Sequence, residues 1–244
     1  MEPGRREEKE PVHIKAKPED VAELCLIMGD PARVEHASSV LSERRLVNAH
    51  RGFIAYTGMY RGLRVTMACH GVGGPSAAIA VEELAMLGAK RFVRLGTTGA
   101  FLEGIEPGDV VVPTAALYRD SVPSLYLGGS VGPTVPDYGL LQAVVRGLEE
   151  RGIRAHLGPV FSSDAFYLES PSFASEWASR GALAVEMECA TIFAVAAVRR
   201  LRAAAVLIVS NNLARRTRML DAEELRPTAL AVTKAILDEL SRER

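Results

Sequence analysis

The sequence has almost no net charge, few cysteines and no long hydrophobic run. Its 29 basic and 30 acidic residues give a net charge of −1, so no overall field would attract nucleic acid or an anionic membrane. The three cysteines lie far apart, without C-x-x-C or Cys/His ligand spacing, which argues against zinc and disulfides and favours buried free thiols. Because no apolar run reaches about 18 residues and the first ten residues are charged, we expect neither a membrane span nor a signal peptide. We expect a cytosolic protein that binds no metal.

Amide side chains are also scarce, since Gln142 is the only glutamine. Depletion of thermolabile amides beside abundant charge is typical of thermophilic proteins, although high-GC codon usage would also raise the content of Ala and Arg.

The 244 residues, 48% of them hydrophobic, are enough for one large core and predict a single domain over 12–244 after a disordered leader over 1–11. Short β-branched runs alternate with longer helical patterns, which indicates an α/β fold with a mixed sheet flanked by helices. We expect strands over 24–28, 52–60, 63–70, 91–95, 109–115, 155–162, 184–185 and 205–210, the second and third forming a hairpin. We expect helices over 31–42, 75–87, 137–151, 172–180, 187–200 and 221–240, and a long loop over 118–137.

The most informative stretch is Arg94-Leu95-Gly96-Thr97-Thr98-Gly99, which follows an apolar run. We interpret it as a turn after a strand, in which backbone N–H groups, hydroxyls and a guanidinium would bind an oxyanion. It is not a Walker loop, since no Gly-Lys-Ser/Thr follows, and the third glycine of a dinucleotide fingerprint is missing. Taken alone, it could equally be an ordinary turn with a surface arginine.

Four glycine- or serine-bearing segments follow predicted strands: 29–33, 70–76, 94–99 and 162–167. In open α/β sheets ligands bind outside the carboxyl ends of strands, so these segments are expected to meet at one pocket. Arg33, Arg51 and Arg94 each stand beside a glycine or at a strand end, and together they would neutralise a dianion such as phosphate. Each one alone is more often an exposed surface arginine.

Two carboxylates, Glu186 and Glu188, bracket Met187 before a helix of small apolar residues. Glu186 could cap that helix or act in a site. Glu188 is the better candidate for function, because a carboxylate accepts well from the vicinal hydroxyls of a sugar, and Met187 offers an adaptable apolar floor. Phe166 could stack on a base or pack in the core.

These segments occur together and in order: Gly29-Asp30-Pro31-x-Arg33, His50-Arg51, Gly71-Val72-Gly73-Gly74-Pro75-Ser76, Arg94-x-Gly96-Thr97-Thr98-Gly99, Ser162-Ser163-Asp164-x-Phe166-Tyr167 and Glu186-Met187-Glu188. In this order the chain resembles the hexameric nucleoside phosphorylases of the uridine and purine phosphorylase type, over nearly its whole length. The resemblance implies a distorted barrel-like mixed sheet wrapped by helices, and dimers assembled into a homohexamer. It implies phosphorolysis of a nucleoside to base and pentose 1-phosphate, with phosphate as co-substrate and no other cofactor.

The resemblance also implies roles for individual residues. The residues implied to bind phosphate are Gly29, Arg33, Arg94 and Thr97, with Arg51 contributed by a neighbouring subunit. Those implied to bind ribose are Met187, Glu188, Thr97 and, across the interface, His13. Those implied to contact the base are Phe166, Thr98, Gly99, Ser170 and Asn211. The catalytic residues would be Arg94, Glu188 and Asn211.

Base choice is where the chain departs from both patterns. Uridine enzymes carry a Gln and an Arg after the Phe-Tyr pair, where this chain offers Ser170 and Ser172. Purine enzymes place an Asp after a late serine to protonate N7, where this chain has Asn211, and an amide cannot act as a general acid. Loss of that acid favours uridine phosphorylase, with Arg215 or Arg216 as other donors to uracil, over a purine nucleoside phosphorylase.

Two further departures concern a cation and the reaction class. Gly52 stands where uridine enzymes often carry a Glu that binds potassium, which argues against that ion here. The same fold hosts nucleosidases that use water, and a non-catalytic nucleoside-binding protein could keep the ribose site. The three arginines argue against water as the nucleophile.

Overall fold

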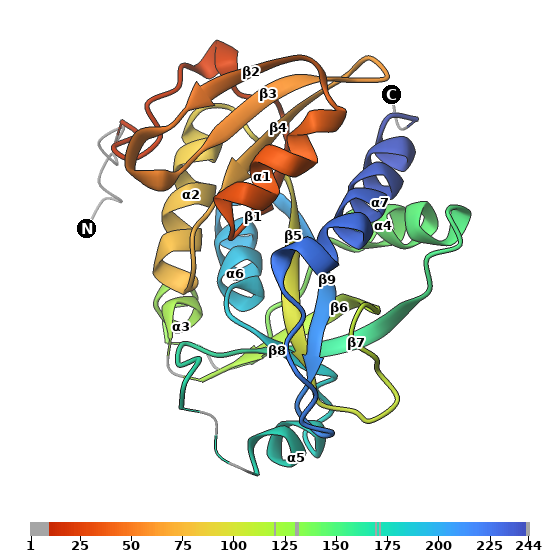
Figure 1. Cartoon of the computed structure of the whole chain (residues 1–244). Helices are drawn as coiled ribbons and strands as arrows, with labels where there is room; N and C mark the ends of the chain where they lie inside the picture. The colour runs from red at the N-terminus through yellow and green to blue at the C-terminus, as the bar shows by residue number, and fades with distance from the viewer. Residues whose placement is uncertain (1–9, 120, 130–131, 169, 171, 243–244) are drawn as a thin grey trace, which may run out of the picture.

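The computed structural model describes residues 10–119, 121–129, 132–168, 170 and 172–242. Over these residues the chain forms one mixed α/β unit (Figure 1). The strands are β1 (Leu24–Met28), β2 (Ser42–Asn48), β3 (Ala55–Tyr60), β4 (Leu63–Cys69), β5 (Arg91–Ala100), β6 (Val110–Tyr118), β7 (Ala155–Ser162), β8 (Ala184–Glu186) and β9 (Arg202–Asn212). The helices are α1 (Pro31–Ala37), α2 (Gly74–Met86), α3 (Val122–Tyr126), α4 (Tyr138–Glu150), α5 (Phe173–Ala178), α6 (Cys189–Arg199) and α7 (Ala222–Leu240). Short 3₁₀ turns are η1 (Pro18–Asp20), η2 (Ser38–Val40) and η3 (His50–Gly52).

The described strands form one sheet in the order β2-β3-β4-β1-β5-β8-β7-β6-β9. β5 also pairs in parallel with β9, so the five strands from β5 to β9 close into a barrel, and the other four extend from it. β3 and β4 form the predicted antiparallel hairpin. The mixed sheet, the barrel and the flanking helices predicted from the sequence are confirmed.

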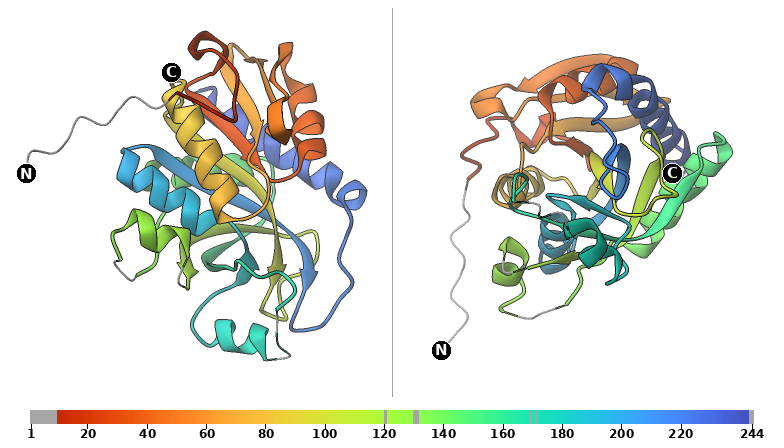
Figure 2. Two further views of the ribbon diagram at one scale, coloured as in Figure 1. Left: turned by 90° about the vertical axis from the view of Figure 1, so that its left-hand side faces the viewer. Right: turned by 60° about the horizontal axis from the view of Figure 1, so that its bottom comes forward.

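Helices cover the sheet on two sides, since α2 and α6 lie on one side of β5 and α4 and α7 on the other (Figures 1 and 2). Successive side chains of β9 point to opposite faces of the sheet, and both faces are apolar. Leu207 packs into the core under α2 and α6, and Ile208 packs into the core under α4 and α7. α7 begins with a capping box in which Asp221 and Glu224 bond each other's backbone N–H groups. None of the helices in the described ranges is long and apolar enough to cross a membrane.

The main correction concerns residues 94–99, which lie inside β5 and do not form a turn. β5 pairs with β1, β8 and β9 along its length, and β-branched Thr97 and Thr98 suit a strand. A side chain at position 96 would collide with Arg94, since a Cβ there would lie 2.7 Å from the guanidinium carbon. Gly96 therefore allows the Arg94 side chain to fold back over the strand.

Other boundaries also differ from expectation. β2 was not predicted, because Ser42–Asn48 is a mostly exposed, charged edge strand without apolar alternation. The strand expected over 52–60 begins only at Ala55, after η3, and the helix expected over 31–42 ends at Ala37. The loop expected over 118–137 contains α3. Residues 1–9 of the expected leader and residues 120 and 130–131 of that loop lie outside the described residues. The three cysteines are buried and free, as predicted.

Candidate active site

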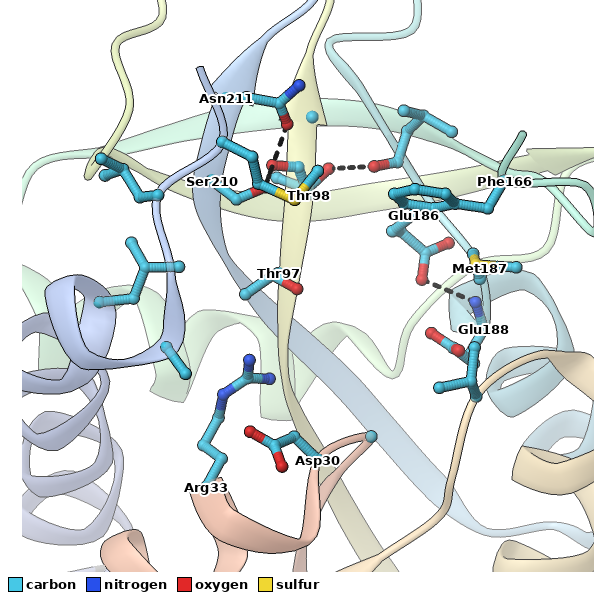
Figure 3. A pocket seen from close by; sticks show the side chains of 18 of the residues that line it. Asp30, Arg33, Thr97, Thr98, Phe166, Glu186, Met187, Glu188, Ser210 and Asn211 are labelled. Carbon is cyan, nitrogen blue, oxygen red and sulfur yellow. Dashed lines mark hydrogen bonds between the residues drawn. The ribbon is translucent and has the colours of Figure 1, made fainter. Parts of the chain in front are cut away.

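A pocket of about 500 Å³ opens where several strands end, and its walls come from all four predicted segments (Figure 3). Most of the predicted site residues line it: Gly29, Arg33, Arg94, Thr97, Thr98, Gly99, Phe166, Met187, Glu188 and Asn211. In Figure 3 Arg33 and Asp30 lie at one end, Ser210 and Asn211 at the other, and Thr97 between them. The convergence expected from strand ends is therefore confirmed.

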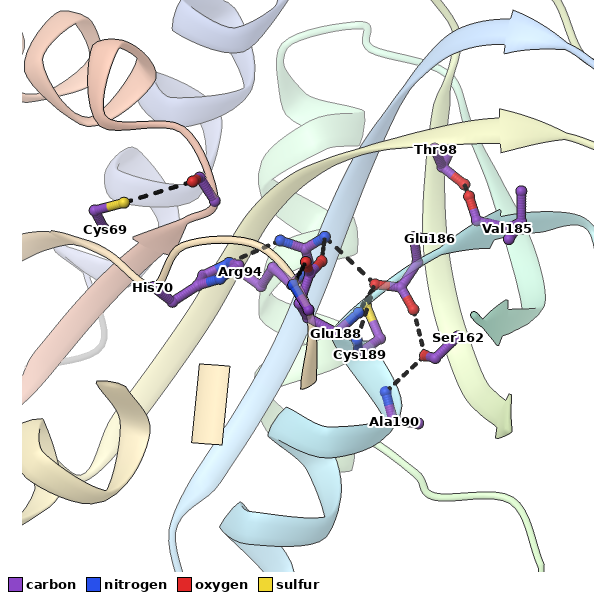
Figure 4. Close-up of polar contacts among 12 residues, drawn as sticks. Cys69, His70, Arg94, Thr98, Ser162, Val185, Glu186, Glu188, Cys189 and Ala190 are labelled. Atoms are coloured by element: carbon purple, nitrogen blue, oxygen red, sulfur yellow. Dashed lines mark hydrogen bonds and ion pairs between the residues drawn. The ribbon is translucent and has the colours of Figure 1, made fainter. Parts of the chain in front are cut away.

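Arg94 lies at the centre of a buried polar network (Figure 4). One guanidinium nitrogen, Nη2, donates to Glu188 Oε2 at 2.5 Å and to Glu186 Oε2 at 3.3 Å. The other, Nη1, donates to His70 Nε2 at 2.8 Å. Burial alone would lower the pKa of Arg94, but Glu188 and Glu186 outweigh it and raise the pKa, so this buried side chain stays cationic.

Glu188 is held between two donors. Its Oε2 accepts from Arg94, and its Oε1 accepts from the backbone N–H of Gly73 at 2.6 Å, in the turn that precedes α2. Burial raises the pKa of Glu188, Arg94 opposes that shift, and Glu186 adds to it. A carboxylate fixed on both oxygens lines the pocket beside Met187 with its orientation already set.

Glu186 acts as a cap for α6, one of the two roles left open by the sequence. Its Oε2 accepts from the backbone N–H groups of Glu188 and Cys189, each at 2.8 Å. The Ser162 hydroxyl donates to Glu186 Oε1 and accepts from Ala190 N at 2.9 Å. These bonds satisfy the free N–H groups at the start of the helix and fix the position of Glu188.

Arg33 and Asp30 form the opposite end of the pocket, on the first turn of α1 (Figure 3). Asp30 caps this helix by accepting from Ala32 N. Burial lowers the pKa of Arg33, and Asp30 opposes that shift. Gly29 allows β1 and β4 to approach, because a Cβ there would lie 3.0 Å from the carbonyl oxygen of Gly71.

At the other end, Ser210 Oγ lies 3.1 Å from Asn211 Oδ1 and 3.2 Å from the carbonyl oxygen of Thr98. Thr98 Oγ1 donates to the carbonyl of Val185 at 2.6 Å. Gly99 leaves room for its neighbours, since a Cβ would come within 2.3 Å of Leu213 and 3.2 Å of Asn211 Oδ1. This end therefore combines one amide with an apolar wall, closed on one side by the half-exposed Phe166.

Three predicted site residues do not line the pocket. Ser170 is exposed, with its hydroxyl 3.2 Å from Ser172 Oγ. Arg51 is exposed in η3, and its positive φ of 53° lies in a region that few non-glycine residues occupy. His13 contacts the carboxylate of Glu83 and the ring of Phe53 instead. Arg215, considered as a donor to uracil, forms a bidentate ion pair with Glu106.

His13 and η3 lie next to each other even though neither reaches the pocket. His50 Nδ1 is 3.1 Å from the carbonyl oxygen of His13. Glu83 of α2 accepts from the backbone N–H groups of Val12, His13 and Ile14 and from His13 Nδ1, at 2.7 to 3.1 Å. His13 and Arg51 thus belong to one surface, separate from the pocket of their own protomer.

The sequence reasoning missed parts of the pocket wall: Leu213, Met219, Leu220 and Leu225. Leu213, Met219 and Leu220 lie on the irregular stretch between β9 and α7, where the sequence shows no periodic pattern. Leu225 lies on the first turn of α7. Ser163 and Ser210 also line the pocket, and each stands beside a residue that the motifs did single out.

The family model of the phosphorylase superfamily matches residues 23–242 of the chain. The chain belongs to this superfamily. It is 40% identical over 201 residues to a guanosine phosphorylase of Halorubrum lacusprofundi, with 82% of this chain and 83% of the relative covered. It is 38% identical over 213 residues to a uridine phosphorylase of Thermococcus kodakarensis, with 82% and 76% covered.

A purine nucleoside phosphorylase of the DeoD type from Jannaschia is 40% identical over 205 residues, with 83% of this chain and 87% of the relative covered. The family predicted from the ordered motifs is therefore confirmed. These relatives are named for different substrates: guanosine, uridine and purine nucleosides. Overall sequence similarity therefore does not identify the base that this chain accepts.

Proposed function

We propose that the chain catalyses the phosphorolysis of nucleosides to free base and pentose 1-phosphate. One observation supports the proposal: Arg94 and Glu188 line the same pocket and are hydrogen-bonded to each other. In the proposal Arg94 binds phosphate and Glu188 binds ribose. Arg33, Thr97 and the backbone at Gly29, which line the same pocket, would complete the phosphate end, and Met187 beside Glu188 would contact the sugar.

In the proposed reaction the bond between C1′ and the base nitrogen breaks, and its electron pair leaves with the base. C1′ becomes oxocarbenium-like, and a phosphate oxygen held by Arg33 and Arg94 forms the new bond to C1′. Fixing the dianion beside the developing cation supplies proximity and electrostatic stabilisation without a protein nucleophile. Glu188 would accept hydrogen bonds from the ribose hydroxyls and hold C1′ in place.

For the base, we propose uridine as the preferred substrate. The supporting residue is Asn211, whose amide lies at the base end and has no proton to give to a purine N7. Uracil leaves as an anion stabilised by its own carbonyl groups and needs hydrogen-bond donors at its oxygens rather than an acid. The amide of Asn211 can supply such a donor.

A 6-oxopurine nucleoside is the second candidate, and the contact between Ser210 and Asn211 favours it. With Asn211 Oδ1 directed at the Ser210 hydroxyl, the amide nitrogen is left to donate to the base. Guanine and hypoxanthine present two adjacent acceptors, O6 and N7, whereas adenine presents an amino group beside N7.

We also propose that a partner subunit completes each site. Two arginines and three carboxylates line the pocket among the described residues, so one protomer alone offers a dianion a net negative environment. Arg51 of a neighbouring subunit would supply the missing cation and His13 a contact to the ribose 5′-hydroxyl, in a homohexamer built from dimers. Buried free thiols are consistent with a cytosolic enzyme.

Rates on uridine, inosine, guanosine and adenosine with phosphate, for the parent and for Asn211→Asp, test the base assignment. We expect the parent to prefer uridine. Asn211→Asp should raise purine nucleoside cleavage at least tenfold, because proton transfer in the transition state contributes about 10²- to 10⁴-fold. Uridine cleavage in the same variant is the internal control and should stay level or fall. A parent that prefers inosine or guanosine, with Asn211→Asp unchanged or worse, would replace uridine by the 6-oxopurine candidate.

A further inference from the structure

His70 has no role in the reaction as derived above, yet it is fully buried next to the site. It follows β4 directly, and its ring nitrogen Nε2 lies 2.8 Å from Arg94 Nη1 (Figure 4). Twenty-four residues separate the two in sequence, so only the pairing of β4, β1 and β5 brings them together.

The hydrogen bond between Arg94 and His70 is possible with only one tautomer of a neutral His70 ring. A guanidinium has only donors, so His70 Nε2 must accept, and the proton of the neutral ring sits on Nδ1. Burial, together with the charges of Arg94 and Arg33, holds the pKa of His70 well below its usual value. A protonated ring would instead direct an N–H at a cation.

His70 is itself held rigidly. Its backbone N–H donates to the carbonyl of Met28 at 2.8 Å, and its carbonyl accepts from the Ser76 hydroxyl at 2.6 Å. Its ring passes close to Gly29, where a Cβ would lie 3.4 Å from His70 Cε1. These contacts fix the backbone of His70 and one face of its ring, while Nδ1 is buried and has no hydrogen-bond partner within the described residues. Burial on this scale leaves the ring little room to turn, so Nε2 stays directed at Arg94.

The remaining donors of Arg94 show what that fixation serves. Nη2 is occupied by Glu186 and Glu188, and one N–H of Nη1 by His70. The buried Nε of Arg94 has no hydrogen-bond partner within the described part of the chain, and Nη1 keeps a second N–H. The second N–H of Nη1 is the donor left for an anion in the pocket that Arg94 lines, since Nε itself is buried.

We propose that His70 is a positioning residue for phosphate: as a neutral acceptor it fixes the guanidinium of Arg94 from one side, while Glu188 fixes it from the other. The inference rests on the proposed phosphorolysis. Without His70 the guanidinium can rotate about its last side-chain bonds, and the donor meant for phosphate loses its direction. Glu188 keeps its second donor, the backbone N–H of Gly73, so the proposed ribose contact depends on His70 much less than the phosphate contact does.

A matched pair of substitutions tests this. His70→Gln carries an oxygen that reaches the place of Nε2, and His70→Met has similar length and volume without that acceptor. We expect His70→Met to raise the KM for phosphate at least tenfold and to leave the KM for the nucleoside within threefold. His70→Gln should keep both within threefold of the parent. Thermal unfolding of each variant shows whether it folds.

Equal phosphate KM values for the Gln and Met variants would overturn the proposal, as would parallel changes in both KM values, which indicate a merely structural role. If His70→Met does not fold, His70→Gln decides alone: a phosphate KM within threefold supports the proposal, and a tenfold rise overturns it. A parent that releases base without needing phosphate would instead overturn the proposed function, so the two failures are distinguishable.

Discussion

Arg94 has both a structural and a functional role. It is 3% exposed and is the cation that balances Glu186 and Glu188, each 4% exposed. Removing one partner of a buried ion pair typically costs about 3 to 5 kcal/mol, since the remaining charge is left uncompensated. Substitution by alanine would therefore confuse loss of fold with loss of phosphate binding.

Arg94→Lys is the cleaner test of this residue. Lysine keeps the buried cation for Glu188 but loses the planar fork that directs the remaining Nη1 N–H at phosphate. We expect a folded protein whose KM for phosphate rises at least tenfold, about 1.4 kcal/mol. Steady-state kinetics with varied phosphate, beside a thermal melt, measures this. An unchanged phosphate KM would remove Arg94 from the phosphate site.

At the scale of elements, the N-terminal segment is fixed to α2 through one side chain, Glu83. Burial alone would raise the pKa of Glu83, but hydrogen bonds from His13 and from the backbone N–H groups of residues 12–14 outweigh it and lower the pKa. A carboxyl group whose pKa is lowered in the folded state stabilises above its unfolded pKa, and this contribution is lost as the pH falls.

Glu83→Gln should reduce the free energy of unfolding at pH 7 by about 2 kcal/mol, because an amide replaces a charged acceptor of four hydrogen bonds. The difference from the parent should shrink as the pH falls below the ordinary value of 4.5. Denaturant unfolding across this range measures both effects. Glu149→Gln on the exposed side of α4 is the control and should change little. A difference that is constant with pH would exclude the charge of Glu83 as its source.

The sequence predicted elements best where one pattern dominates. β1 and β7 match their predicted bounds because apolar runs end at clear breaks, and α7 begins with a capping box that is visible in the sequence. The Gly/Thr stretch of β5 misled the interpretation, since the glycines accommodate Arg94 and Leu213 rather than a turn. Such close approaches are tertiary contacts that spacing does not encode.

Which residues share the pocket could be predicted only in part. Residues a short distance after a strand, such as Arg33 after β1 and Glu188 after β8, could be placed in one pocket because strand ends meet. The pairing of His70 with Arg94 could not be predicted, because it depends on strand register. The wall formed by Leu213 and Met219 lies on irregular chain, where packing alone decides position.

At the scale of the whole molecule, the pocket is lined by strands of the closed barrel, among them β5, β8 and β9. His13 and η3 contact each other but do not line this pocket. The proposed sharing of sites between subunits predicts complementation. Arg51→Ala and Arg94→Lys protomers, each weakly active when phosphate is kept well below the KM of either variant, should regain activity after dissociation and joint reassociation. Random pairing across a two-fold interface restores about one quarter of the sites.

Activity measurements before and after subunit exchange, with exchange verified by native mass spectrometry of tagged chains, follow this recovery. Self-mixed samples of each variant are the controls. No recovery in exchanged material would place Arg51 in its own protomer's site or outside any site.

The central claim is that this pocket transfers a pentose to phosphate rather than to water. The most direct measurement is the release of base from uridine and from the purine nucleosides with and without orthophosphate, with the sugar product identified by ³¹P NMR. The account predicts that base release requires phosphate and yields pentose 1-phosphate in equal amount. Base release at the same rate without phosphate, giving free pentose, would contradict it.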